Sequence, residues 1–175
     1  MDQVHVQAPA GRSRAHTLER EFYSDFPLLV NYVARLTDSM DHAPGIACEA
    51  MRLAFHDPRS HANQAFPRAE IYRIATELSR RSLKPRRWFR RRRSTGVVLE
   101  GFPRQEASRA LRKDTIQRAL AAMPLDARAA VLLRDFVRLS YEELSEVLDI
   151  PVRKLVHTLD RSRAELGEIY DYIKF

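Results

Sequence analysis

The sequence predicts an all-α protein with two small helical domains joined by a flexible linker. Apolar residues recur at steps of three and four along most of the chain, the spacing of one buried helical face. Glycine is scarce, with 5 in 175 residues, and alternating strand patterns are absent. Composition divides the chain into a flexible N-terminal arm (1–16), a helical domain (17–93), a linker (94–107) and a second helical domain (108–175).

The charge balance favours a polyanionic partner. The chain holds 30 Lys and Arg against 23 Asp and Glu, a formal net charge of +7. This indicates nucleic acid first and an anionic membrane surface second. The single cysteine, Cys48, excludes an intramolecular disulfide, and neither a membrane span nor a secretory signal is visible. We therefore expect a cytoplasmic protein.

The first domain should be a bundle of three helices. The first helix should begin at Thr17, with Pro27 accommodated if the chain restarts there on a Ser24 or Asp25 cap. We expect a second helix over residues 44–56 and a third over residues 67–83, because Pro85 disfavours helix in the residue before it. The expected inward residues of these two helices are Ile46, Ala50, Met51, Leu53, Ile71, Ile74, Ala75, Leu78 and Ser82.

Residues 80–93 carry the densest positive charge, with nine Lys or Arg and no acid. Such cations release counterions from phosphates, and aromatic side chains such as Trp88 and Phe89 stack on unpaired bases. The segment is therefore a candidate contact for an opened nucleic-acid strand. Two alternatives stay open: a solvated linker, or packing of the two aromatic side chains on the bundle. Arg12 and Arg14 of the arm could also contact DNA.

The second domain ends in a predicted helix-turn-helix. Ser140 and Glu143 have the spacing of a capping box that starts the middle helix, and Asp149 ends it before an Ile150–Pro151 turn. In the last helix we expect a buried stripe of Val152, Leu155, Val156, Leu159 and Leu166. Another face gathers Arg153, Lys154, His157 and Arg161. A capped helix, a tight turn and a basic second helix form the geometry that docks in a major groove.

Particular motifs in this domain carry a family resemblance. They are Ala119-Leu120, Met123-Pro124, Arg128, the segments 131–134 and 139–152, and the closing Arg161, Arg163 and Leu166. Together they resemble region 4, the promoter-reading domain of extracytoplasmic-function (ECF) sigma factors. Residues 43–55 and 71–75 (IYRIA) are similar to region 2 of the same family, which binds RNA polymerase and melts the promoter.

The resemblance implies binding residues but no cofactor. It places DNA contacts of region 4 at Ser140, Tyr141, Arg153, Lys154, His157, Thr158 and Arg161. It places those of region 2 at Arg73, Glu77, Arg80, Arg81, Lys84, Arg86, Arg87 and Trp88, and polymerase contacts at Glu49, Cys48 and Arg52. The implied partners are RNA polymerase core, through its beta and beta-prime subunits, promoter DNA and an anti-sigma factor.

The sequence departs from the family at working positions. The family's polymerase-binding D-x-x-Q-E becomes GIACE at residues 45–49, and the usual Trp and Asn around IYRIA are Glu70 and Glu77. In the recognition helix, the usual K/R-S-R becomes Val156-His157-Thr158. We expect the last two to reach base edges, and the methyl groups of Val156 or Thr158 to meet thymine.

The expected function is that of an ECF sigma factor directing promoter recognition and opening. Two rivals stay open: a sigma-like DNA-binding regulator or anti-sigma decoy that does not engage polymerase, and a non-specific nucleic-acid binder. The six histidines are dispersed, and their spacing with Cys48 matches no closed zinc pattern. No phosphate loop or nucleophile motif is present. We therefore expect neither a metal site nor an enzyme.

Overall fold

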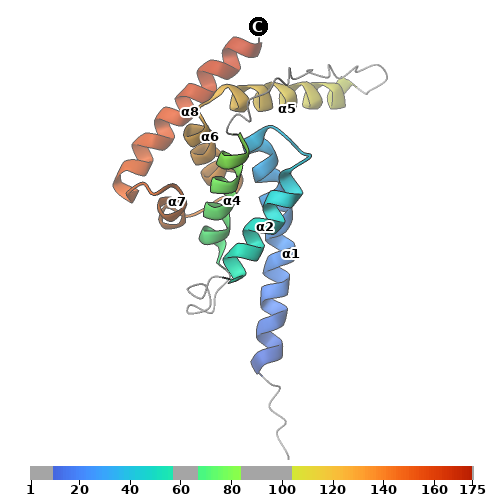
Figure 1. The fold of residues 1–175 in the computed structure, drawn as a ribbon. Helices are drawn as coiled ribbons and strands as arrows, with labels where there is room; N and C mark the ends of the chain where they lie inside the picture. Colours follow the sequence, from blue (N-terminus) through green and yellow to red (C-terminus); the bar gives the residue numbers. More distant parts are fainter. Residues whose placement is uncertain (1–9, 57–66, 84–103, 175) are drawn as a thin grey trace, which may run out of the picture.

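The computed structural model describes residues 10–56, 67–83 and 104–174, and within these residues the protein is all-α, as predicted. The elements are α1 (Ala10–Thr37), α2 (Ala43–His56), α4 (Arg68–Leu83), α5 (Arg104–Ala122), α6 (Leu125–Val131), the π-helical turn η1 (Leu132–Phe136), α7 (Tyr141–Leu148) and α8 (Val152–Lys174). Figure 1 shows α1, α2 and α4 on one side and α5 to α8 on the other.

The N-terminal bundle is formed by α1, α2 and α4, which pack against one another. Its core combines large residues of α1, such as Leu29 and Tyr32, with a row of small residues on α2. Because alanines line α2, its backbone approaches its neighbours closely. On α4, the buried side is rotated from the predicted one: Tyr72 and Thr76 lie inside, whereas Ser82 lies outside.

The first helix differs from the prediction at two points. It begins at Ala10 rather than Thr17, so the expected arm is helical over residues 10–16. It also runs unbroken through Pro27, so the predicted restart is wrong. Asp25 caps nothing there; its carboxylate pairs with Arg68 of α4 at 3.2 Å. Burial raises the pKa of the Asp25 carboxyl group. The Arg68 guanidinium lowers this pKa, but by less than burial raises it.

The C-terminal unit is formed by α5, α6, η1, α7 and α8. The first of these begins at Arg104, so residues 104–107 are helical and not part of the predicted linker. Residues 94–103, the rest of that linker, lie outside the described residues. The helix that starts at Leu125 widens into the π-turn η1, and Arg138 then takes a positive φ of 68°. The chain thereby turns into α7.

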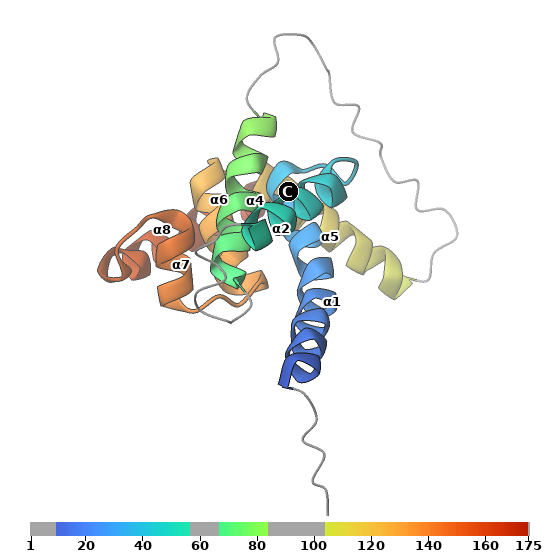
Figure 2. The ribbon, with the colours of Figure 1, turned by 60° about the horizontal axis from the view of Figure 1, so that its bottom comes forward.

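The two units share one hydrophobic core. The first helix of the bundle packs on α5, α6 and η1, and α4 packs on α7. Buried side chains from both units, such as Leu36 and Leu133, belong to the same cluster. In both views the N-terminal part of α8 lies on the side of the molecule away from α1 and α2 (Figures 1 and 2). Its outer face is therefore not covered by the bundle.

A buried arginine joins the units. Arg128 of α6 is only 7% exposed and donates hydrogen bonds to the carbonyl oxygens of Leu36 (2.6 Å), Ala121 (2.7 Å) and Met123 (3.1 Å). These carbonyls lie at the C-terminal ends of α1 and α5, where helices leave acceptors unsatisfied. One guanidinium therefore stabilises the negative ends of two helix dipoles.

Candidate nucleic-acid interface

The predicted capping box starts α7. The Ser140 hydroxyl accepts a hydrogen bond from the backbone N–H of Glu143 at 3.1 Å, and the Glu143 carboxylate accepts one from the Ser140 N–H at 2.7 Å. Hydrogen bonds from its own backbone and from Ser140 also lower the pKa of Glu142. The first turn of α7 is thus fixed by its own side chains.

The turn into α8 is equally well determined. Asp149 ends α7 with a left-handed φ of 55°, as helix C-termini often require. The Ser145 hydroxyl then donates to the carbonyl of Ile150 at 2.8 Å, and Leu155 and Leu159 of α8 are fully buried. These contacts orient the second helix of the motif, and they confirm the predicted helix-turn-helix.

The first three turns of α8 present a basic outer face. Arg153, Lys154, His157 and Arg161 are all exposed. Among the residues that the structure describes, none of these four has an ion-pair partner within 4.0 Å. We call these four residues the basic face of α8. Its charge is available to an outside polyanion.

Two predicted core residues of α8 lie in solvent. Val152 is 42% exposed and Val156 is 53% exposed, so the expectation that they belong to the buried stripe is wrong. The fully buried residues of α8 are Leu155 and Leu159, on a different side of the helix from the two valines, and Leu166 is half-buried. Periodicity alone does not locate the edge of a buried stripe.

The remaining predicted contacts of this unit have partners within the protein. The ring of Tyr141 lies under the Arg134 guanidinium, with 4.3 Å between that group and the ring centroid. The Thr158 hydroxyl donates to the carbonyl of Lys154 at 2.9 Å, and the residue is half-buried. Both side chains therefore help to hold the motif together.

The arginines of α4 lie in a different environment. Arg73 pairs with Glu70 at 2.7 Å. Arg81 pairs with Glu77 at 3.0 Å, and Arg80 lies 3.6 Å from Glu77. Arg80 also forms a 2.8 Å ion pair with Asp126 at the start of α6, across the contact between the units. The other predicted contacts, Lys84, Arg86, Arg87 and Trp88, lie outside the described residues.

The predicted polymerase-binding residues lie on the outer side of α2. Glu49 accepts two hydrogen bonds from the Arg52 guanidinium, at 2.8 and 2.7 Å, which lower the pKa of the carboxyl group. Cys48 is an exposed free cysteine.

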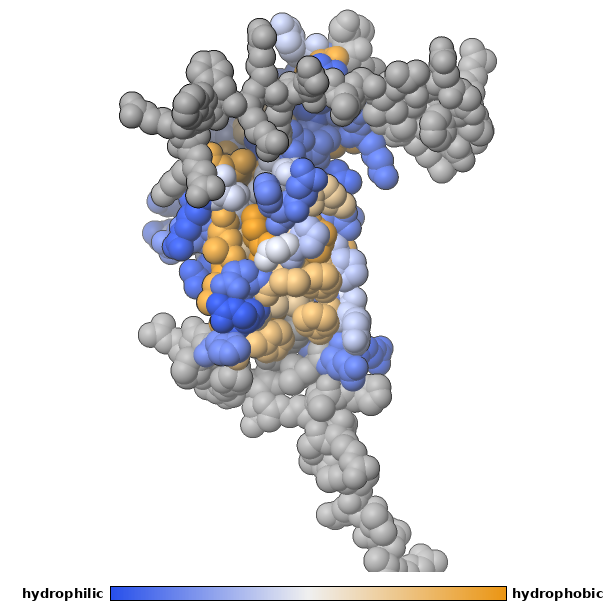
Figure 3. Space-filling view, turned by 45° about the vertical axis from the view of Figure 1, so that its right-hand side comes forward, coloured by the Kyte–Doolittle hydropathy of each residue, from blue (hydrophilic) through white to orange (hydrophobic). Residues whose placement is uncertain are grey.

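Figure 3 shows hydrophobic residues gathered in the middle of one face of the molecule, with hydrophilic residues at its edges.

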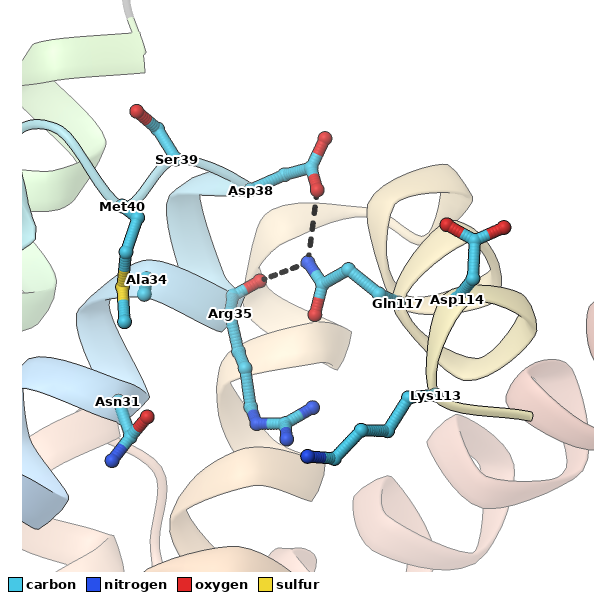
Figure 4. Close-up of a pocket in the computed structure, with 9 residues that line it drawn as sticks. All are labelled: Asn31, Ala34, Arg35, Asp38, Ser39, Met40, Lys113, Asp114 and Gln117. Carbon is cyan, nitrogen blue, oxygen red and sulfur yellow. Dashed lines mark hydrogen bonds between the residues drawn. The ribbon is translucent and has the colours of Figure 1, made fainter. Parts of the chain in front are cut away.

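A cleft of about 430 Å³, with both charged and apolar residues in its lining, lies between α1 and α5. Within it, the Gln117 side-chain amide donates to the carbonyl of Arg35 (3.2 Å) and to the Asp38 carboxylate (3.1 Å), as Figure 4 shows. These two hydrogen bonds link the units. The charged residues around the cleft have both signs and form no cluster of one charge. Sequence reasoning did not single out Gln117, because nothing local indicates a partner about eighty positions away.

The described residues show neither a metal-binding group nor a membrane-spanning helix. No group of three or more His, Cys, Asp or Glu side chains lies close enough together to hold an ion within these ranges. No helix of the described part of the chain is long and apolar enough to cross a bilayer. Among these residues, the basic face of α8 is the feature best suited to bind a large anion.

Comparison with known proteins agrees with this geometry. Residues 113–166 match the family model for Sigma-70, region 4. The chain is 26% identical over 166 residues to RNA polymerase sigma factor YlaC of Bacillus subtilis (strain 168), covering 89% of this chain and 91% of that relative. Its fold resembles that of the sigma factor RpoE, solved in complex with the anti-sigma factor NepR from Bartonella quintana, with a TM-score of 0.54, 16% identity and coverage of 87% and 96% of the two chains.

These findings define the class of the C-terminal unit: its residues 113–166 match sigma region 4, and α7 and most of α8, which form the helix-turn-helix, lie within that match. The two wider matches also include the helical bundle that precedes this unit, since they cover 89% and 87% of the chain. Over most of its length, the chain is similar to an RNA polymerase sigma factor in sequence and to a second sigma factor in fold.

Proposed function

We propose that this chain binds RNA polymerase core and directs it to promoters, with α8 docked in the major groove of the upstream promoter element. The basic face of α8 carries the proposal, since four exposed basic residues without ion-pair partners lie on the second helix of a helix-turn-helix. Such a factor has no catalytic role of its own and works in the cytoplasm.

Arg153, Lys154 and Arg161 would contact phosphates, which position the helix without reading sequence. His157 lies on the same exposed face and would reach a base edge. The Ser140 hydroxyl and the first turn of α7 would lie against the DNA backbone, as the first helix of such motifs does. The capping box supports this role because it keeps the α7 N-terminus and its backbone N–H groups in place.

The N-terminal bundle would contact polymerase and the opened promoter. Glu49, Arg52 and the exposed Cys48 of α2 are the residues that the family resemblance assigns to polymerase contact, and Glu49 is the one that the family's motif keeps. Arg73, Arg80 and Arg81 would contact the displaced strand together with the predicted basic segment 84–93. For that, Arg80 must exchange Asp126 for a phosphate, so promoter opening would weaken a contact between the units.

Run-off transcription tests the proposal. Purified bacterial core polymerase and this chain are combined with DNA from upstream of its own gene, and a discrete transcript that depends on the chain is expected. The variant Arg153→Gln/Lys154→Gln/Arg161→Gln, which leaves the described core untouched, is the matched control and should give little transcript. No transcript together with no co-elution with a matched core would contradict the proposal.

One observation favours a second candidate, a sigma-like regulator or anti-sigma decoy that does not engage polymerase. The polymerase-binding segment keeps only Glu49, and this carboxylate is already bound to Arg52. Such a protein would still bind duplex DNA or an anti-sigma factor. Specific duplex binding without co-elution with core would favour this candidate over the first.

A further inference from the structure

Two valines on α8 lie in solvent beside the basic face. Val152 and Val156 are 42% and 53% exposed and are four residues apart, so they lie on neighbouring turns of one side of the helix. They occupy the first and second turns of α8, which begins at Val152. These are the turns of a recognition helix that approach the base edges.

Their chemistry differs from that of the basic residues beside them. Arg153 and His157 directly follow the two valines and are exposed. The cations are suited to phosphates and to acceptors on guanine, whereas the valines offer only methyl groups. In the major groove the one apolar feature of the base edges is the 5-methyl group of thymine.

Valine is also well suited to a rigid contact. Its branched side chain has one strongly preferred rotamer in a helix, so its methyl groups are already placed before DNA arrives. Little conformational entropy is lost on binding, unlike the case of a long cationic side chain. An exposed valine at this position therefore gains from meeting another methyl group.

From this arrangement we propose that Val156, supported by Val152, selects thymine in the upstream promoter element through its 5-methyl group. The inference rests on the proposed function, because it requires α8 to lie in the major groove. Thr158 is the less suitable reader: its hydroxyl is bonded to the carbonyl of Lys154 and it is only half-exposed. Leu155 is fully buried and cannot reach DNA.

The test removes one methyl group at a time from the DNA and from the protein. Duplexes are first selected from a random library by the full chain bound to core polymerase. Each thymine of the selected element is then replaced by uracil, which lacks only the 5-methyl group. Affinity is measured for the natural chain, for Val156→Ala and for Val152→Ala. The control is Tyr172→Ala, since Tyr172 is 87% exposed near the far end of α8.

Uracil at one thymine should weaken binding of the natural chain by about fourfold, the value of one buried methyl group. With Val156→Ala the thymine duplex should bind about as weakly, and uracil should cause no further loss. Tyr172→Ala should behave like the natural chain. Because Val156 is exposed, its truncation should leave the fold intact, and circular dichroism checks this.

The outcomes distinguish thymine selection by Val156 from the proposed promoter binding by α8. Selective enrichment of a duplex with no uracil penalty at any thymine would overturn the inference and leave the proposed function standing. A uracil penalty of the same size in Val156→Ala and in the natural chain would also overturn it. Failure to enrich any sequence would overturn the inference and the proposed function together.

Discussion

Helices α4 and α8 both carry rows of basic residues, but only α8 presents them without partners. On α4, Arg73, Arg80 and Arg81 each bind a carboxylate of the protein. On α8, the four residues of the basic face bind none among the described residues. The number of arginines on a helix therefore does not measure how much of its positive charge is unpaired.

The spacing of acids explains the difference. A Glu or Asp three or four residues before an Arg pairs with it on a helix surface. Helix α4 has this spacing twice, from Glu70 and from Glu77. Within α8 no acid precedes the basic face at this distance, whereas Asp160 stands three residues before Arg163 and lies 3.8 Å from it. The free charge of α8 follows from where its acids are placed.

The largest expected effect comes from weakening the contact between the two units. Arg128→Met should lower the free energy of unfolding by about 3 kcal/mol, because three backbone carbonyls lose a charged donor. It should also weaken the contact that places Asp126 beside Arg80. Urea unfolding followed by circular dichroism measures the loss.

The matched control for this variant is Arg163→Met. Its side chain is 42% exposed and pairs with the exposed Asp135, so the loss should be below about 1 kcal/mol. Equal losses for the two variants would show that the buried bonds of Arg128 contribute nothing beyond a surface ion pair.

Removal of positive charge from α8 and from α4 in turn should affect duplex binding differently. Arg153→Gln/Lys154→Gln/Arg161→Gln should weaken duplex binding about 100-fold at low salt, and should reduce the slope of log K against log salt by almost 3, about 0.9 per phosphate contact. Filter binding across a salt series measures both quantities.

The control on the other helix is Arg73→Gln/Arg81→Gln. Because both arginines are paired within α4, their removal should change the duplex slope by less than 1. If this variant changed the salt slope more than the α8 variant does, then α4 and not α8 would make the larger contribution to duplex binding.

A smaller effect separates the structural role of Ser140 from its proposed contact with DNA. Ser140→Ala should cost about 1 kcal/mol of stability, because the α7 cap is lost. Ser140→Asp should keep the cap, since Asp caps as well as Ser does, but its charge should repel a nearby phosphate. Thermal unfolding and duplex affinity, measured on both variants, distinguish the roles. Unchanged affinity in Ser140→Asp would place this residue away from DNA.

The local features of the site could be read from the sequence, because their causes are local. The capping box at Ser140, the end of α7 at Asp149 and the exposed basic residues of α8 depend on neighbours within a few positions. The third helix of the bundle also ends at Leu83, where Pro85 requires it to end.

The features that the sequence did not reveal depend on distant partners. Arg128 meets the end of a helix 92 positions earlier, and Arg80 meets an acid of the other unit. Likewise, the positions of Val152 and Val156 outside the core depend on where α7 and α6 pack on α8. Pro27 stays helical because the long α1 is held by α2, α4 and the C-terminal unit, which outweighs one missing hydrogen bond.

The smallest predicted effect comes from a variant of α4 in which two arginines lose an acid partner. Their charge then resembles the unpaired charge of α8. Glu77→Gln removes the carboxylate that Arg80 and Arg81 share, while both arginines remain. Stability should change by less than about 1 kcal/mol, since exposed ion pairs contribute little. Binding to DNA with an opened strand should become several-fold tighter and its salt slope steeper by about 0.7 for each newly contacted phosphate. Glu49→Gln, which makes the same charge change on α2, should leave that slope unchanged. If both variants steepen the slope equally, net charge rather than the release of Arg80 and Arg81 controls binding. In that case the contrast between the two helices would concern their structure and not their affinity for DNA.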